Sequence, residues 1–108
     1  MKYSVFLTEN AVRDLEDIKD YLTASDSSAR AAYVLDRIEQ SIQRLAEQPQ
    51  RGRIPRELQE TGMKEFREIF FKPYRILYRI IDADVFVLLA ADGRRDMQTL
   101  LQRRLLRE

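Results

Sequence analysis

Arginine side chains at strand-like spacing are the groups of this chain best suited to chemistry. Arg67, Arg75 and Arg79 lie within two apolar segments, and Arg94 and Arg95 precede a short basic helix. A guanidinium group presents its N–H donors in a planar fork that matches phosphates and carboxylates. The chain has no histidine and no cysteine, so any reaction would depend on Arg, Lys, Tyr and carboxylate groups. The pattern predicts a surface that binds an anionic partner.

The composition fits a single globular domain that spans residues 1–108, with 44% apolar and 34% charged side chains. Residues 1–48 carry a net charge of −3 and residues 49–108 carry +4, which together give the +1 of the whole chain. This asymmetry predicts one electropositive face, although ordinary scatter of charges over a solvated surface gives similar sums. Without histidine or cysteine a zinc site is not expected, and the sequence indicates no cofactor.

The first ten residues contain a brief apolar run that turns polar at once. This run is too short for the hydrophobic core of a signal peptide and too short for a membrane span. We therefore expect a soluble, cytoplasmic protein with no membrane partner.

Two amphipathic helices are predicted after an N-terminal strand at residues 1–8. Apolar residues recur with a helical period from residue 9 to 25, and again from a polar break at 26–28 to about residue 47. Thr8 or Asn10 can cap the first helix, and Pro49 stops the second. The brief link between the two helices predicts an antiparallel αα-hairpin.

Three further strands are predicted beyond a loop at residues 49–63, which has room for one helical turn around residues 56–59. The strands cover residues 65–71, 74–82 and 85–91, and the last is apolar on both faces, as in a strand covered on both sides. Asp96 can cap a C-terminal helix. The order β-α-α-β-β-β-α predicts an α+β domain, with a mostly antiparallel four-stranded sheet packed against the N-terminal αα-hairpin.

The arginines of the predicted sheet also have a structural explanation. Arg75 and Arg79 share one face of their strand. Either can pair with Glu65 or Glu68 on the neighbouring strand, and Arg79 is better placed because Arg75 directly follows the turn. Aromatic residues at alternating strand positions are most simply core residues, namely Phe66, Phe70, Phe71, Tyr74, Tyr78 and Phe86.

Arg94 and Arg95 stand where a helix begins, and cations there oppose the helix dipole at a cost of about a few tenths of a kcal/mol each. In the structural explanation, Asp92 and Asp96 neutralise them. In the functional explanation, free N–H groups at the helix start and two guanidinium groups form an anion site for a phosphate or for a partner's carboxylate. We favour the functional explanation.

The order of elements and two short motifs resemble the RelE/ParE superfamily of toxins from bacterial type II toxin–antitoxin modules. The motifs are P-Y-R-I-L-Y-R-I at residues 73–80 and G-R-R-D at residues 93–96, and the resemblance covers essentially the whole chain. It implies a toxin that inhibits bacterial growth and is neutralised by a cognate antitoxin, whose acidic C-terminal segment wraps across the helices and the sheet. RelE-like members cut mRNA on the ribosome, whereas ParE-like members poison DNA gyrase.

The positions of this chain that correspond to the catalytic residues of the mRNA-cleaving members help to distinguish these two activities. The phosphate-binding arginine falls on Arg75, the arginine before the last helix on Arg95, and a basic strand position on Arg67. These three are the expected catalytic residues if the chain is an endoribonuclease. A second expected lysine falls on Ile69 and the catalytic tyrosine falls near Leu101, and neither side chain can transfer a proton.

The missing proton-transfer groups favour the ParE-like branch, in which DNA gyrase is the expected target and the chain is not expected to be an enzyme. The residues expected to bind gyrase, the antitoxin or another anion are Arg75, Arg79, Arg94, Arg95, Arg103 and Arg104. Two alternatives remain. One is a ribosome-dependent mRNA interferase, with the ribosome and mRNA as partners, and the other is an inactive module that only binds the antitoxin.

Overall fold

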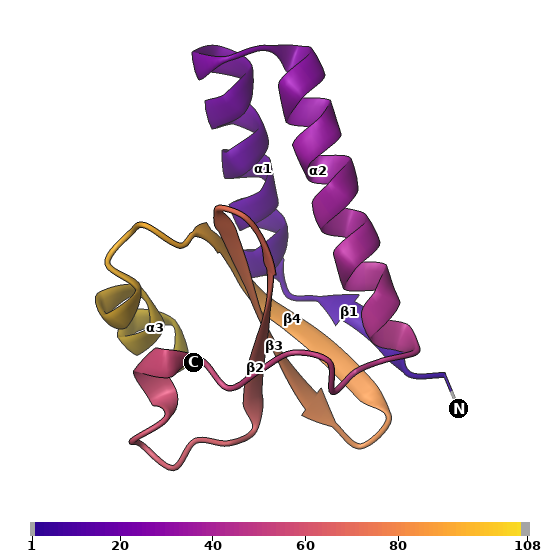
Figure 1. The fold of residues 1–108 in the computed structure, drawn as a ribbon, viewed down its shortest axis with the longest axis vertical. Coiled ribbons are helices and arrows are strands. Elements are labelled where there is room, and N and C mark those ends of the chain that lie inside the picture. The colour runs from indigo at the N-terminus through magenta and orange to yellow at the C-terminus, as the bar shows by residue number, and fades with distance from the viewer. Residues whose placement is uncertain (1, 107–108) are drawn as a thin grey trace.

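A long helical hairpin stands against one face of a four-stranded sheet in the computed structural model, which describes residues 2–106 (Figure 1). Along the chain the elements are β1 (Ser4–Leu7), α1 (Glu9–Ser25), α2 (Ser28–Gln43), β2 (Phe66–Phe71), β3 (Tyr74–Ile81), β4 (Asp84–Asp92) and α3 (Met97–Leu106). Two short 3-10 turns, η1 (Arg44–Ala46) and η2 (Arg56–Leu58), lie between α2 and β2. The predicted α+β order is confirmed, including the helical turn in the loop.

The sheet has the strand order β1-β4-β3-β2 and is mixed. Strands β2, β3 and β4 pair in antiparallel fashion, as predicted, whereas β1 runs parallel to β4. Parallel neighbours cannot be joined by a tight turn. Here the hairpin, β2 and β3 all intervene in the sequence between β1 and β4, so the first and last strands meet only in the folded chain.

Side-chain caps define where the two hairpin helices begin. The Thr8 hydroxyl accepts a hydrogen bond from the Ala11 N–H (3.1 Å), as predicted, and the Ser27 hydroxyl accepts one from the Arg30 N–H (3.0 Å). Such caps satisfy backbone donors that have no partner in the first helical turn. Regular α-helix ends at Gln43 and continues as η1, slightly before the predicted boundary near residue 47.

Two apolar cores lie on opposite faces of the sheet. The inner core, between the sheet and the hairpin, includes Ile76 and Tyr78. The outer core, between the sheet and both α3 and η2, includes Leu77, Leu89 and Leu101. Successive side chains of a strand point to opposite faces, so β3 supplies Ile76 to one core and Leu77 to the other. The faces of β3 therefore decide which side of the molecule each of its arginines reaches.

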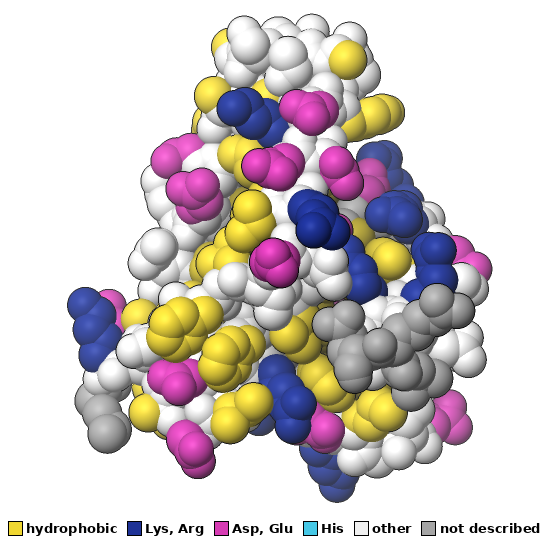
Figure 2. All heavy atoms as spheres, turned by 180° about the vertical axis from the view of Figure 1, so that it is seen from behind, with side chains coloured by type: hydrophobic (Ala, Val, Ile, Leu, Met, Phe, Trp, Pro, Cys, Tyr) yellow, Lys and Arg dark blue, Asp and Glu magenta, His cyan; other side chains and the backbone are white. Residues whose placement is uncertain are grey.

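The outer face of the sheet is covered over the second half of β4, where Leu89 and Ala91 pack in the outer core. Over the first half, Phe6 and Phe86 stack with their ring centroids 5.5 Å apart, and Phe6 is 47% exposed. Figure 2 shows hydrophobic side chains gathered on this side of the molecule, with cationic side chains among them. The prediction of a strand covered on both faces is thus correct only for the second half of β4.

The prediction of a uniformly buried aromatic set is wrong for Phe70, which is 41% exposed. Phe70 lies near the end of the edge strand β2 and on the outer face of the sheet. The guanidinium of Arg53 lies over its ring, 4.9 Å from the centroid. A strand pattern predicts the face on which a side chain lies, but it does not predict whether another element covers that face.

Candidate functional site

Arg75 is buried between two carboxylates. It lies on the outer face of β3 and is 8% exposed. Its Nε donates to Glu68 Oε1 at 2.8 Å, while Nη1 and Nη2 donate to the two oxygens of Glu57 at 2.9 and 2.7 Å. Glu68 belongs to β2 and Glu57 to η2, so this Glu57–Arg75–Glu68 triad joins the long loop to the sheet.

The triad has two negative groups for one positive group, and its two carboxyl groups differ. The bidentate contact with Arg75 holds the pKa of Glu57 below its usual value. Burial raises the pKa of Glu68, although Arg75 opposes that shift. Glu68 Oε2 has no hydrogen-bond partner within residues 2–106, and the Nε of Arg53 lies 3.9 Å from it. Arg75 is therefore neutralised and held in place.

Cross-strand pairing with Glu68 belongs to Arg75 and not to Arg79, which is the reverse of the expectation from sequence. Glu68 lies opposite Leu77, and a long arginine side chain reaches it along the diagonal. Arg79 lies opposite Phe66, and its guanidinium stands over that ring, 5.7 Å from the centroid. The strand register, which the sequence pattern leaves open, decides between the two pairings.

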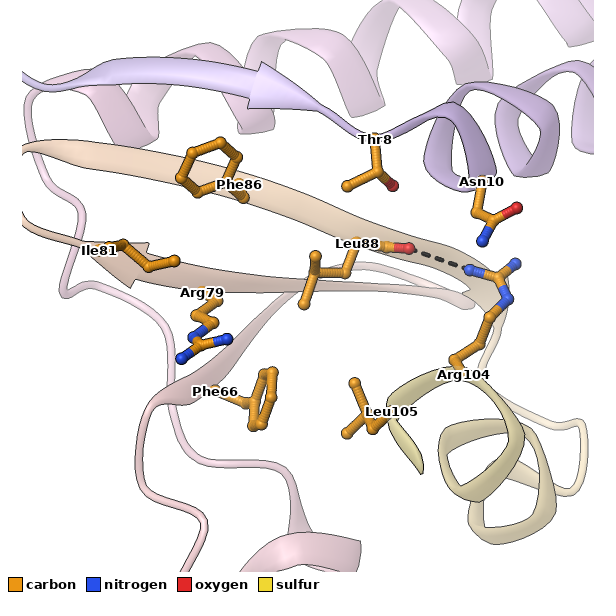
Figure 3. Close-up of a pocket in the computed structure, with 9 residues that line it drawn as sticks. All are labelled: Thr8, Asn10, Phe66, Arg79, Ile81, Phe86, Leu88, Arg104 and Leu105. Atoms are coloured by element: carbon orange, nitrogen blue, oxygen red, sulfur yellow. Dashed lines mark hydrogen bonds between the residues drawn. The ribbon is translucent and has the colours of Figure 1, made fainter. Parts of the chain in front are cut away.

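A groove of about 300 Å³ on the outer face brings Arg79 and Arg104 to the same surface (Figure 3). Its apolar lining comes from three strands and α3, and consists of Phe66, Ile81, Phe86, Leu88 and Leu105. In Figure 3 Arg79 stands beside Phe66 at one end, and Arg104 lies at the other end near Leu88 and Asn10. We call this surface the outer-face groove. An apolar lining with a cation at its rim suits an amphipathic segment that carries a carboxylate.

Arg104 fastens α3 to the rest of the fold. Its guanidinium donates to the Leu88 carbonyl at 2.9 Å and forms a close ion pair with Asp14 of α1. Asp14 also accepts a hydrogen bond from the Ala90 N–H at 3.0 Å. Burial raises the pKa of Asp14, although the contacts with Ala90 and Arg104 oppose this shift. Arg103, in contrast, is exposed on α3.

The two arginines before α3 have different surroundings. Arg94 turns back to the strand end, where its Nε and Nη2 donate to the carboxylate of Asp92 at 2.9 and 2.6 Å, and this contact lowers the pKa of Asp92. Asp96 caps α3 as predicted and accepts from the Thr99 N–H at 3.2 Å. Arg95 is exposed and borders a hollow that Glu57 also lines. The structural explanation thus applies to Arg94, whereas Arg95 presents its charge to solvent.

A family model described as the ParE toxin of the type II toxin–antitoxin system, parDE, matches residues 5–97. The matched range includes β2, β3, β4, both helices of the hairpin, and β1 except for its first residue. The chain belongs to the ParE toxin family. As a toxin of a toxin–antitoxin system, this ParE-family protein has an antitoxin as its partner. Comparison with curated protein sequences found no significant match.

Several solved structures share the fold of this chain. The chromosomal ParDE system of P. aeruginosa has a TM-score of 0.71 at 17% identity, and the comparison covers 84% of this chain and 96% of that chain. A doubly substituted E. coli RelE toxin in the free state has a TM-score of 0.66 at 17% identity, with coverage of 99% and 98%. The RelBE2 toxin–antitoxin complex of Mycobacterium tuberculosis has a TM-score of 0.57 at 26% identity, with coverage of 85% and 92%.

The residues carried over from mRNA-cleaving toxins do not gather at one site in this ParE-family toxin. Arg67 lies opposite Tyr78, whose side chain is in the inner core, whereas Arg75 points to the outer face. Arg67 Nη1 donates to the Gly52 carbonyl at 2.8 Å, so its guanidinium holds the loop. On β2, the face that Arg75 shares carries Glu68. The sheet therefore separates the two arginines.

The positions expected to carry proton-transfer groups in an mRNA-cleaving toxin are also apart. Ile69 is 4% exposed and lies in the inner core, and Leu101 is 2% exposed and lies in the outer core. Both are packed among apolar side chains on opposite faces of the sheet. Ile69 and Leu101 also border different hollows, one beside Phe70 and the other beside Leu58.

Sequence reasoning missed three polar groups that organise these surfaces. Glu57 lies in the arginine-rich loop at residues 49–63, and no local sequence pattern links it to β3. Asp14 gave a usable signal, because it lies three residues after Ala11 and so interrupts the apolar face of α1. The Tyr78 hydroxyl donates to the Pro49 carbonyl at 2.6 Å and accepts from the Gly52 N–H at 3.0 Å. A tyrosine on an apolar strand face predicts burial, but its hydroxyl partner depends on the fold.

Two features are absent from residues 2–106. No group of three or more Asp, Glu, His or Cys side chains is arranged to hold a metal ion in that range. No helix there is both long and apolar enough to cross a membrane.

Proposed function

We propose that this ParE-family toxin stops bacterial growth by poisoning DNA gyrase and that its antitoxin relieves the block. The state of Arg75 carries the proposal. Catalysis of RNA cleavage requires cations positioned to stabilise a charged phosphate. In this chain Glu57 and Glu68 already occupy the Nε, Nη1 and Nη2 donors of Arg75.

The ParE family match supports the same branch of the superfamily. A toxin that acts by binding needs exposed groups, and Arg95 and Arg103 are exposed cations before and within α3. Exposed charges contribute to the rate and specificity of association more than to raw affinity. We propose that Arg95 and Arg103 contact the gyrase complex. The buried Glu57–Arg75–Glu68 triad supports the end of the molecule that carries these two arginines.

We further propose that a segment of the antitoxin lies in the outer-face groove. The groove is lined by apolar side chains and has Arg79 at its rim. Arg79 is exposed and rests on Phe66, so its charge remains available to a carboxylate of the partner. An amphipathic segment with apolar anchors and an acidic residue near Arg79 fits this surface.

The test combines purified toxin, DNA gyrase and supercoiled plasmid. We expect the toxin to cause accumulation of cleaved plasmid DNA. The double variant Arg95→Glu/Arg103→Glu should lose this effect, while Arg13→Glu, which changes an exposed arginine on α1, should retain it. Equal poisoning by the wild type and the double variant would contradict the assigned contact residues. No cleaved plasmid with active wild-type toxin would contradict gyrase as the target.

Controlled expression in a bacterium separates the proposed function from its alternatives. With short pulses of labelled thymidine and methionine, gyrase poisoning predicts that DNA synthesis fails first. Earlier loss of methionine incorporation, with cleaved mRNA, would instead indicate an mRNA interferase. Normal growth would indicate an inactive module that binds only the antitoxin.

The antitoxin surface has its own test. Arg79→Glu places a negative charge at the rim of the outer-face groove, so we expect weaker binding of the cognate antitoxin by isothermal titration calorimetry. Arg13→Glu serves as the control for the change of charge alone. If both variants bind the antitoxin as the wild type does, the antitoxin lies elsewhere on the toxin.

A further inference from the structure

A second groove, of about 470 Å³, lies beside the edge strand β2. Its lining combines three kinds of side chain: cations, an aromatic ring and one carboxylate, from Arg51, Arg53, Glu68, Ile69, Phe70 and Lys72. We call this surface the β2-edge groove. Arg51, Arg53 and Lys72 are all exposed, and none of them was singled out by the resemblance to known toxins.

The backbone that carries the two arginines of this groove is held firmly. Arg53 forms a β-bridge with Glu68, with its N–H donating to the Glu68 carbonyl at 3.1 Å and its carbonyl accepting at 2.7 Å. Just before it, the Tyr78 hydroxyl accepts from the Gly52 N–H, and Arg67 donates to the Gly52 carbonyl. A loop fixed in this way presents its side chains with less ordering cost on binding.

Phe70 forms an exposed aromatic platform between these cations. It is 41% exposed and belongs to neither apolar core. Arg53 lies over its ring at 4.9 Å from the centroid, which is close enough for a cation–π contact. Positive charge that flanks an exposed aromatic ring is the combination by which proteins bind single-stranded nucleic acids, because bases stack on the ring while cations meet phosphates.

The groove also contains a carboxylate oxygen that makes an ion pair with Arg53 at 3.9 Å but accepts no hydrogen bond within residues 2–106. This oxygen, Glu68 Oε2, is buried. Buried polar atoms nearly always have a hydrogen-bond partner, so a buried oxygen without one requires an explanation. Every nucleobase carries an N–H donor on its pairing edge, and a nucleotide also offers a phosphate and a π-face. An acidic peptide segment would supply anions and backbone N–H donors, but its carboxylate side chains offer no π-face to stack on Phe70.

We propose that the β2-edge groove binds a single-stranded segment of nucleic acid. A base stacks on Phe70, and the flanking phosphates meet Arg51 and Lys72. Movement of Arg53 toward a phosphate opens Glu68 Oε2 to an N–H donor of the base. This inference goes beyond the proposed function, because binding to a free strand requires neither gyrase nor the antitoxin.

Fluorescence anisotropy with a labelled DNA oligonucleotide of about 15 nucleotides tests the proposal directly. Loss of the stacking contact in Phe70→Ala should weaken binding at least about fivefold. Phe70→Leu keeps apolar bulk but removes the π-face, and it should weaken binding similarly. Phe6→Ala is the matched control, since Phe6 is a similarly exposed phenylalanine on β1, the opposite edge of the sheet.

The salt dependence of binding tests the cations separately. For single strands the slope of log K against log salt changes by about 0.7 for each phosphate contact. Arg51→Gln/Lys72→Gln should therefore reduce the slope by about 1.4. The control Arg13→Gln/Lys19→Gln also removes one arginine and one lysine, but from α1, and it should leave the slope unchanged. Thermal unfolding of each variant checks that the fold is retained.

Three results would overturn the proposal. They are absence of salt-dependent binding by the wild type, equal weakening by Phe6→Ala and Phe70→Ala, and displacement of the oligonucleotide by polyglutamate as readily as by unlabelled DNA. The gyrase cleavage assay reports independently on the proposed function. A toxin that traps cleaved plasmid but does not bind the oligonucleotide would keep the first conclusion and lose the second.

Discussion

Replacing Arg75 by methionine tests whether the Glu57–Arg75–Glu68 triad is a structural unit. Methionine keeps an unbranched apolar stem, so the main loss is the charge and its hydrogen bonds. The side chains of Glu57 and Glu68 are only 11% and 2% exposed. Removal of one partner from a buried ion pair typically costs about 3–5 kcal/mol, because the remaining charge stays buried without compensation. We expect a loss of this size in the free energy of unfolding at pH 7.

Urea and thermal unfolding of the purified toxin measure this change. For a chain of about this length, each kcal/mol lowers the melting temperature by roughly 4 °C, so the shift should be at least about 12 °C. Arg94→Met is the matched control, because it also breaks a bidentate arginine–carboxylate contact, but one whose arginine side chain is 78% exposed. Exposed ion pairs contribute little to stability. The control should therefore melt close to the wild type.

The pH dependence of the same measurement gives a second check with a defined sign. In the wild type the pKa of Glu57 is lowered by Arg75, so its contribution to stability is present at neutral pH and is lost as the pH falls through its folded-state pKa. In Arg75→Met both carboxyl groups lose their cation, and burial raises their pKa values in the folded state. The folded variant then binds protons more readily than the unfolded chain, so its stability rises as the pH falls.

The difference between wild type and Arg75→Met should accordingly shrink from pH 7 to about pH 4. The triple variant Glu57→Gln/Glu68→Gln/Arg75→Met removes all three charges and should recover much of the loss, as is common when a buried ionic group is replaced completely. A variant within about 1 kcal/mol of the wild type at pH 7, or a difference that does not change with pH, would refute the role assigned to the triad.

Three other substitutions follow from particular contacts. Tyr78→Phe leaves the buried N–H and carbonyl of the 49–52 loop without their hydroxyl partner, so urea unfolding should show a loss of about 1–3 kcal/mol and the loop amides should exchange faster. An added Cβ at Gly93 would lie 2.7 Å from Arg75 Cδ, so Gly93→Ala should lower the melting temperature by overpacking, at a cost of about 1–3 kcal/mol. Arg104→Met should speed amide exchange in α3 while Arg103→Met does not, because Arg104, unlike the exposed Arg103, donates to Asp14 of α1 and to Leu88 of β4.

Local periodicity predicted the elements of this fold because each element obeys a rule that its own residues reveal. The helical period of α1 and α2, the caps at Thr8 and Asp96, and the alternation along β3 all depend on neighbours within a few residues. These features fixed the α+β order and the hairpin. The same local patterns also placed Arg75 and Arg79 on one strand face, which the structure confirms.

The candidate site was less predictable, because its contacts join residues distant in the sequence. Arg75 meets a carboxylate seven residues away across the β2–β3 turn and another eighteen residues away in η2. Arg104 meets Asp14 across ninety residues. No periodicity links such pairs. The resemblance to known toxins also predicted that Arg67 and Arg75 share one site, although the two side chains lie on opposite faces of the sheet.

Sequence alone determined the classes of element, the family-like motifs and the surplus of arginine in the second half of the chain. Tertiary structure decided which arginines keep their charge available. Arg75 is drawn into a buried ion pair and Arg104 into a partly buried one, whereas Arg79, Arg95, Arg51 and Arg53 remain on the surface. The physical reason is that a guanidinium group is always charged, so its function depends on whether the fold supplies a carboxylate, a carbonyl or only water.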